Sequence, residues 1–182
     1  MSGSYHQGDV VPRLLRALYE LIQESGHTAV SMRAIARRAG VSHSAHKHHL
    51  GSRAGILTAF AVEGHRRLQL RLRNAAHAEL VGLTPFEAGI EYIQFAREEW
   101  PFFEVMFLSI ELRRNDPEFV SACEVTANMM LAPDRARPID GHGRPTEDAS
   151  LTWALAHGCA VSRRRGNGLP SVVEGAYRRL YP

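Results

Sequence analysis

Apolar residues recur every three or four positions along most of the chain, and no stretch shows the strict alternation of a half-buried strand. This spacing predicts an all-α fold. A first helix follows Asp9 and ends at Gly26, a second begins after Ser31, and a third, short helix begins after Ser42. Each of these helices starts after a residue whose side chain can accept a hydrogen bond from the first helical turn.

The later helices have similar start signals. A long helix is expected from Gly51-Ser52 to about Val81, and residues 132–145, rich in proline and glycine, are expected to form a loop. The other helices begin at caps or at prolines suited to a first turn. Their starts are Thr84-Pro85, Pro101, Asp116-Pro117, Thr146 and Pro170.

The second and third helices are joined by the turn Gly40-Val41-Ser42, which is the pattern of a helix-turn-helix. Ala36 is small where two such helices cross, and Gly40 can adopt the positive φ that the turn requires. In a helix-turn-helix the second helix enters the major groove of DNA and the first crosses the backbone. The pattern therefore indicates a DNA-binding module near the start of the chain.

Charge divides the chain more sharply than its net value of +3 indicates. Residues 1–82 hold eleven Lys or Arg and five Asp or Glu, whereas residues 83–182 hold eleven and fourteen. Between Ser25 and Val62 there is no carboxylate, while five cations and five histidines are present. A polyanion is expected to bind this half, with a basic surface kept for solubility as the alternative.

Three segments resemble the DNA-binding domain of TetR-type transcriptional regulators. They are Tyr5–Asp9, Ser31–Ser42 and Gly51–Leu57, in the order and at the spacing of that domain over about residues 5–66. A weaker similarity links Trp153–Gly158 to the Trp–His–Gly element in the C-terminal domain of one subgroup. The resemblance implies an all-helical homodimer that binds operator DNA and is usually released by a small molecule held in the C-terminal domain.

With this resemblance, we expect eight residues to contact DNA. Four would face the major groove: His43, Ser44, Lys47 and His48. Four would hold phosphates: Arg33, Ser42, His49 and Arg53.

The recognition helix departs from the family pattern. Lys47 stands where the family commonly has tyrosine, Leu50 replaces an aromatic residue, and His46 lies at an ordinarily apolar position. An ammonium can reach a phosphate or the O6/N7 edge of guanine, and we expect the guanine contact.

Metal and enzyme functions are weaker hypotheses. His43, His46 and His49 recur every three residues, and two imidazoles of such a set could bind zinc or copper, but no carboxylate or cysteine lies near them in the sequence. No metal and no cofactor is therefore predicted. The sequence has no nucleophile elbow, zinc-protease motif or P-loop, so no enzymatic activity is predicted. Cys123 and Cys159 are expected to be reduced, buried thiols.

The C-terminal part carries residues that suit either a core or an effector pocket. We expect a small-molecule effector to contact aromatic and Met side chains there, with His157 as the one polar group. The candidates are Tyr92, Phe95, Phe103, Met106, Phe107, Met130, Trp153 and His157. A buried histidine bonded to the backbone is an equally good interpretation of His157.

The resulting prediction is a two-domain regulator: a helix-turn-helix domain over residues 1–52 and a regulatory and dimerisation domain over residues 53–182. It would bind palindromic operator DNA as a homodimer joined through its last two helices, and act as a repressor. A cytoplasmic location is expected, since no secretory signal and no apolar run of roughly 18–20 residues is present. The alternative function is a metal- or ligand-binding helical protein that has lost sequence-specific DNA binding.

Overall fold

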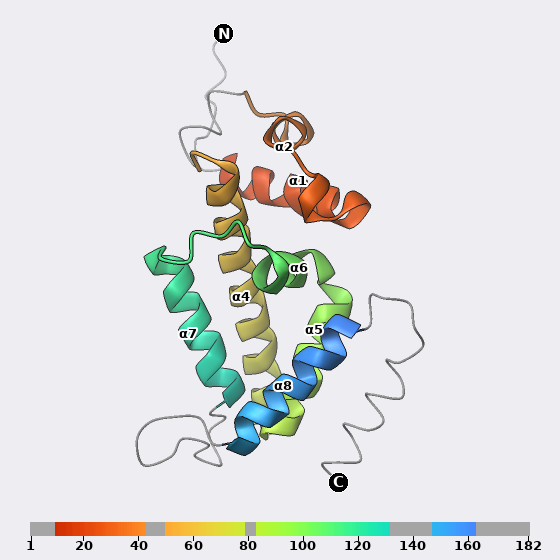
Figure 1. Ribbon diagram of the computed structural model, residues 1–182, viewed down its shortest axis with the longest axis vertical. Helices are drawn as coiled ribbons and strands as arrows, with labels where there is room; N and C mark the ends of the chain where they lie inside the picture. Colours follow the sequence, from red (N-terminus) through yellow and green to blue (C-terminus); the bar gives the residue numbers. More distant parts are fainter. Residues whose placement is uncertain (1–9, 43–49, 79–82, 132–146, 163–182) are drawn as a thin grey trace. The chain divides into compact units, whose positions relative to one another are not determined.

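The computed structural model describes residues 10–42, 50–78, 83–131 and 147–162 (Figure 1). Every regular element within these ranges is a helix, which confirms the all-α prediction. The elements are α1 (Val10–Ser25), the 3-10 turn η2 (His27–Ala29), α2 (Met32–Ala39), α4 (Arg53–Ala78), α5 (Pro85–Glu98), α6 (Trp100–Leu108), α7 (Pro117–Leu131) and α8 (Glu147–Ser162). No helix in the described part of the chain is long and apolar enough to cross a membrane.

The chain forms two compact units. The first contains the residues up to Gly64 together with Trp100–Val120, and the second contains His65–Glu99 together with the residues from Ser121 onward. The first unit thus joins α6 to the N-terminal helices, so it includes residues from both sides of the domain boundary expected at residue 52.

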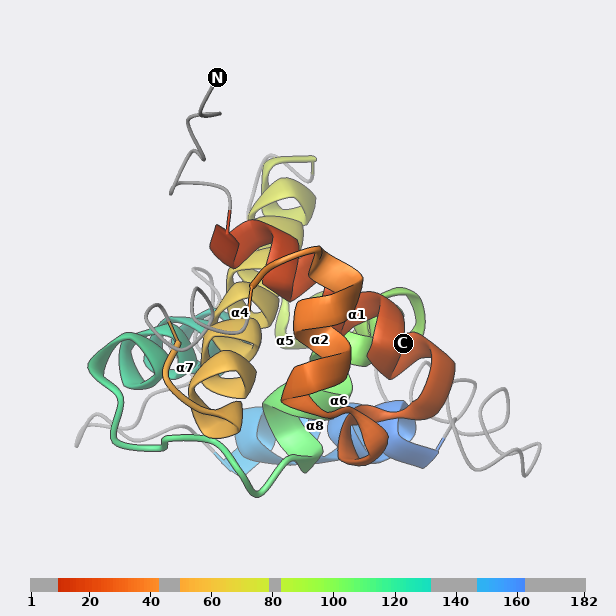
Figure 2. The same ribbon diagram turned by 90° about the horizontal axis from the view of Figure 1, so that it is seen from above.

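In the first unit, α1 and α2 pack across each other (Figure 2). α1 buries one apolar face, which includes Leu14, Leu18 and Ile22 at 0% exposure. α2 starts as predicted, because Ser31 Oγ accepts a hydrogen bond from the Ala34 amide at 3.2 Å. Ile35 and Ala36 of α2 are buried, so the opposite face of this short helix is the exposed one.

The core of the first unit is completed by α6 and by the N-terminal part of α4. The rings of Phe60 and Phe102 stack with centroids 4.2 Å apart. Gly64 permits this close packing, since a Cβ at that position would lie 2.5 Å from Met106 Sδ and 3.0 Å from Phe102 Cβ. The α6 segment is therefore part of the same core as the N-terminal helices.

In the second unit, α5 begins with a complete capping box between Thr84 and Glu87, and α8 packs on α5. Arg71 of α4 holds α5 through Glu91, Gln94 and Glu98 at 2.5, 2.7 and 2.6 Å. The packing of α8 on α5 joins helices that are far apart in the sequence.

The predicted helix starts at Thr84 and Pro101 match the observed boundaries within one residue, and the Asp116 cap is present, with Asp116 Oδ1 accepting from the Phe119 amide at 3.2 Å. The prediction of two buried thiols is half wrong, because Cys159 is buried but Cys123 is only half-buried. The third helix, the loop at 132–145 and the helix from Pro170 lie outside the described residues.

Candidate DNA-binding surface

The exposed face of α2 carries two arginines one helical turn apart. Arg33 and Arg37 are both exposed, and neither side chain forms a hydrogen bond or ion pair with another residue of the described ranges. Ser42, three residues after the end of α2, is also exposed. Two guanidinium groups are thus presented to solvent by a helix that, in a helix-turn-helix, crosses the DNA backbone.

Arg37 was missing from the sequence-based set of phosphate contacts. The spacing of four residues from Arg33 could have identified it, because residues i and i+4 lie on the same side of a helix. The structure adds what spacing cannot show, namely that Arg37 has no carboxylate partner in the described part of the chain.

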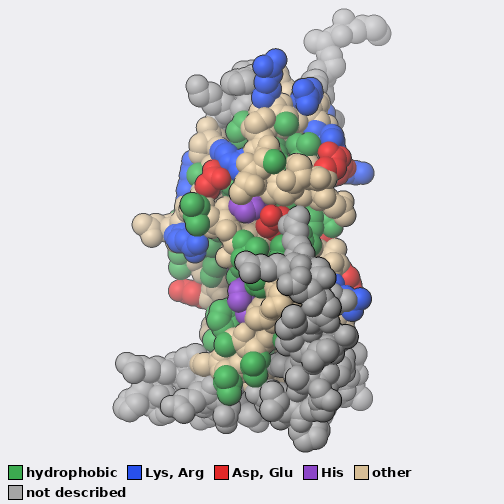
Figure 3. Space-filling view, turned by 45° about the vertical axis from the view of Figure 1, so that its right-hand side comes forward, with side chains coloured by type: hydrophobic (Ala, Val, Ile, Leu, Met, Phe, Trp, Pro, Cys, Tyr) green, Lys and Arg blue, Asp and Glu red, His purple; other side chains and the backbone are tan. Residues whose placement is uncertain are grey.

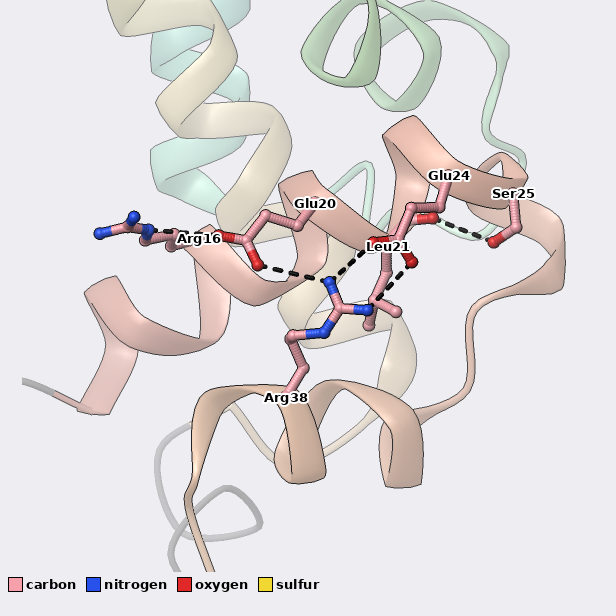
Figure 4. A network of polar contacts seen from close by, with 6 residues as sticks. All are labelled: Arg16, Glu20, Leu21, Glu24, Ser25 and Arg38. Carbon is pink, nitrogen blue, oxygen red and sulfur yellow. Dashed lines mark hydrogen bonds and ion pairs between the residues drawn. The ribbon is translucent and has the colours of Figure 1, made fainter.

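Arg38, the next residue, is held by α1. Its side chain reaches between Glu20 and Glu24 (Figure 4), with Nη1 2.9 Å from Glu24 Oε1 and Nη2 3.0 Å from Glu24 Oε2. Glu20 Oε2 lies 3.4 Å from Arg38 Nη1, and Glu20 also pairs, through its other oxygen, with Arg16. The hydrogen bonds from Arg38 lower the pKa of Glu24 below its ordinary value. Arg38 is therefore committed to joining α1 and α2.

Arg53, at the first position of α4, makes three internal contacts. Its Nε donates to Glu111 Oε2 at 2.8 Å, its Nη2 donates to the His27 carbonyl at 2.7 Å, and its Nη1 donates to the Val30 carbonyl. The hydrogen bond from Arg53 lowers the pKa of Glu111. The phosphate role expected for Arg53 stays a prediction, but its donors point at the protein.

The carboxylate-free stretch of sequence is thus not free of carboxylates in space. Glu24 lies just before it and Glu111 far beyond it, yet they neutralise Arg38 and Arg53. Figure 3 shows such mixing at the surface, where carboxylates (red) stand beside Lys and Arg side chains (blue). Of the five cations counted in the stretch, Arg33 and Arg37 are the two in the described residues without such a partner.

The end of α2 is set by Gly40 and Arg13. Gly40 has φ 61°, as predicted for the turn, and its amide bonds back to the Arg37 carbonyl at 3.2 Å. Arg13 Nη2 donates to the carbonyls of Ala39 and Gly40 at 2.6 and 3.1 Å. Arg13 therefore caps the C-terminal end of α2 from α1, a role that no sequence pattern indicated.

The remaining predicted contacts belong to the third helix expected from the sequence. His43, Ser44, Lys47, His48 and His49 lie outside the described residues, as does His46 of the histidine triplet. Their roles toward DNA or a metal stay predictions.

The eight effector candidates divide between the two units. Phe103, Met106 and Phe107 of α6 belong to the first unit, where Phe103 and Met106 are buried in the core with the N-terminal helices. The others belong to the second unit: Tyr92 and Phe95 on α5, Met130 on α7, and Trp153 and His157 on α8. The assignment of all eight to an effector stays a prediction.

Three of those candidates are brought together in the second unit. Tyr92, fully buried on α5, has its hydroxyl 2.8 Å from Nδ1 of His157, and the ring of Trp153 stacks on His157 with centroids 5.3 Å apart. Burial lowers the pKa of His157 and raises the pKa of Tyr92. His157 Nδ1 thus lies within hydrogen-bonding distance of a side-chain hydroxyl group.

A second buried polar cluster joins α4 to α7. Thr126 Oγ1 donates to the Ala122 carbonyl at 2.9 Å and accepts from Gln69 Nε2 at 3.1 Å. Its one proton is used, so His65 Nδ1, 3.0 Å away, is the donor in that pair. His65 Nε2 then carries the lone pair that faces Cys123 Sγ at 3.4 Å. Burial lowers the pKa of His65 to about 4, so this histidine is neutral at pH 7.

A family model described as bacterial regulatory proteins of the tetR family matches residues 14–60. Residues 14–60 are a tetR-family domain. This tetR-family domain spans most of α1, all of α2 and the first part of α4, and it supports a DNA-binding transcriptional regulator. The surface of Arg33 and Arg37 lies within it.

Solved structures extend the similarity beyond the tetR-family domain. A protein of unknown function from Rhodococcus sp. RHA1 is 24% identical, with a TM-score of 0.72 over 98% of this chain and 96% of that one. A TetR family transcriptional regulator, PfmR, from Thermus thermophilus is 21% identical, with a TM-score of 0.62 over 91% of this chain and 95% of that one. At these identities the likeness shows a shared fold. No curated protein matches the sequence.

Proposed function

We propose that the chain is a homodimeric repressor that binds palindromic operator DNA and is released by a small-molecule effector. The observation that carries the DNA-binding part is the pair of exposed arginines on α2, within the tetR-family domain, that contact no carboxylate of the described ranges. We assign Arg33, Arg37 and Ser42 to the phosphate contacts and the recognition helix around Lys47 to the bases.

Two measurements test this assignment: selection of the bound sequence from random duplex DNA, and the salt dependence of binding. The protein is incubated with random duplex DNA, and the enriched sequence is expected to be an inverted repeat. If each subunit neutralises about three to five phosphates, the logarithm of the affinity falls with the logarithm of salt concentration with a slope of about −5 to −9. No enrichment together with a slope near −1 would contradict DNA binding as the function.

Lys47 is the residue expected to read a base. Replacing Lys47 with alanine should cost about 1–3 kcal/mol of binding and relax the preference at one position of each half-site. A phosphate contact would instead weaken all sites evenly and flatten the salt slope by about one. A panel of half-site variants distinguishes the two, and no effect on any sequence would exclude Lys47 from the site.

Support for the dimer comes from α8. Leu151, Ala154 and Gly158 are exposed at spacings of three and four, and Leu151 is 57% exposed. An apolar helical face of this kind, joined by the helix expected from Pro170, suits the four-helix interface of a symmetric dimer.

Effector binding is proposed for the regulatory part of the chain. The Tyr92, Trp153 and His157 cluster supports it, because it combines two aromatic rings with a hydroxyl group and an imidazole whose pKa is lowered by burial. Isothermal titration with a compound library, followed by measurement of operator release, tests the proposal. Compounds that bind without changing operator affinity would contradict the regulatory role.

A further inference from the structure

The turn between α1 and α2 is held at its backbone by Arg53. This side chain donates to two backbone carbonyls. One belongs to His27, the first residue of η2, and the other to Val30, which directly follows the end of η2. The next residue, Ser31, is the N-cap of α2. The place where α2 begins therefore depends on where the Arg53 guanidinium lies.

The same turn is held at its side chain by α6. His27 is 8% exposed, and its Nδ1 lies 3.1 Å from Glu104 Oε1. Because a carboxylate can only accept, His27 is the donor in this bond. Trp100 Nε1 donates to the other Glu104 oxygen at 3.1 Å. The turn is thus fixed from two sides within the first unit.

The Arg53 side chain is oriented by a segment that is itself anchored. The Arg113 amide donates to Thr58 Oγ1 at 2.9 Å, and Arg113 Nη2 donates to Ser52 Oγ at 2.9 Å. Ser52 directly precedes α4, and Thr58 lies in its second turn. Glu111 lies two residues before Arg113. The Arg113 bonds therefore place the Glu111 carboxylate where it accepts a hydrogen bond from Arg53 Nε.

We propose that Arg53 is a positioning residue that sets the start of α2 and is oriented by Glu111, and that it is not a ligand of DNA phosphate. The inference rests on the proposed DNA-binding function and concerns the same site. A planar guanidinium donates in fixed directions, here toward two carbonyls and one carboxylate. An ammonium at this position could not reproduce those directions.

Two variants test the proposal: Glu111→Gln, which keeps the shape but removes the charge, and Arg53→Lys, which keeps the charge but not the geometry. Positioning predicts that both lower operator affinity, by about tenfold as for a lost charge-assisted hydrogen bond, with an unchanged salt slope. A phosphate role predicts the opposite for Glu111→Gln, because freeing Arg53 would strengthen binding and steepen the slope. A phosphate role also predicts little change for Arg53→Lys.

The controls make the same changes at exposed positions away from this turn. Glu124→Gln on α7 and Arg73→Lys on α4 measure the effect of losing a carboxylate or exchanging a cation as such. Neither control is expected to change operator affinity.

Amide hydrogen exchange of the free protein provides a readout independent of DNA. Both test variants should accelerate exchange in α2 by about fivefold or more while leaving α5 unchanged, whereas the controls should leave α2 unchanged. Failure of wild-type protein to bind DNA would refute the proposed function but not this readout. Unchanged exchange in α2 for both test variants, or tighter DNA binding by Glu111→Gln, would overturn the positioning role.

Discussion

Arg38 of α2 and Glu24 of α1 form a bidentate ion pair, in which each of two guanidinium nitrogens donates to one carboxylate oxygen, at 2.9 and 3.0 Å. The adjacent Arg37 is exposed and has no such partner in the described ranges. Two neighbouring arginines with the same charge are thus used differently, one between helices and the other toward solvent.

This difference predicts unequal effects on DNA binding. Arg37→Ala should reduce affinity for all sequences and flatten the salt slope by about one for each subunit, because a phosphate contact is lost. Arg38→Ala removes the same charge but should leave the slope unchanged. Fluorescence anisotropy over a salt series measures both, and equal slopes for the two variants would contradict the assignment of Arg37.

The exposed face of α8 leads to a prediction for dimer stability when Gly158 is replaced by a larger residue. A Cβ at Gly158 would meet nothing within 4 Å among the residues that the structure describes, so Gly158→Leu should leave the folded monomer intact. In a dimer formed through this face, the leucine would enter the interface and raise the dissociation constant by about tenfold or more.

Sedimentation equilibrium measures this dissociation, with Asn128→Leu on the exposed side of α7 as the control. A variant as dimeric as the wild type, or a wild type that is monomeric at micromolar concentration, would show that α8 does not form the interface.

Because His65 is buried with a lowered pKa, the protein is expected to lose stability in acid. Its pKa is lowered to about 4 by burial, from an ordinary value of 6.5. Below pH 6.5 the unfolded chain binds a proton that the folded chain does not, so the free energy of unfolding falls as the pH drops toward 4. The contribution is complete above pH 6.5, and about 3 kcal/mol of it is lost by pH 4.

Urea unfolding of wild type and His65→Gln at pH 7.5 and 4.5 tests this contribution. The variant lacks the titrating group, so its loss of stability between the two pH values should be smaller by nearly that amount. Equal losses for both proteins would mean that His65 is not buried in its neutral form.

Tyr92 and His157 are expected to be coupled in stability. Tyr92→Phe removes the hydroxyl that contacts His157 Nδ1 in a buried setting, which should cost about 1–3 kcal/mol. A double-mutant cycle with His157→Leu should then give a coupling energy of about 0.5–3 kcal/mol. Chemical denaturation of the four proteins measures it, and additive single effects would argue against the bond.

Helix starts could be predicted because their determinants are local. Ser31 and Asp116 accept from amides three residues on, and the capping box of Thr84 spans the same distance. The positive φ of Gly40 follows equally from the turn that its neighbours require. The domain match over residues 14–60 likewise includes Ser31–Ser42 and Gly51–Leu57, two of the segments that carried the family resemblance in the sequence.

The state of each charge could not be predicted in this way. Arg38 and Glu24 are separated by 14 residues and Arg53 and Glu111 by 58, and core packing rather than local pattern brings them together. For the same reason the sequence grouped Phe103 with Tyr92 as effector candidates, whereas packing places Phe103 in the core of the first unit.

Local patterns in the chain were therefore enough to specify the helices, the turn after α2 and the DNA-binding class, since each depends on residues within a few positions of one another. Folding was needed to show that Arg33 and Arg37 are presented to solvent while Arg38 and Arg53 are held by carboxylates. The physical reason is that a cation's availability depends on which carboxylates lie within a few ångströms, and folding sets those distances between elements remote in the chain.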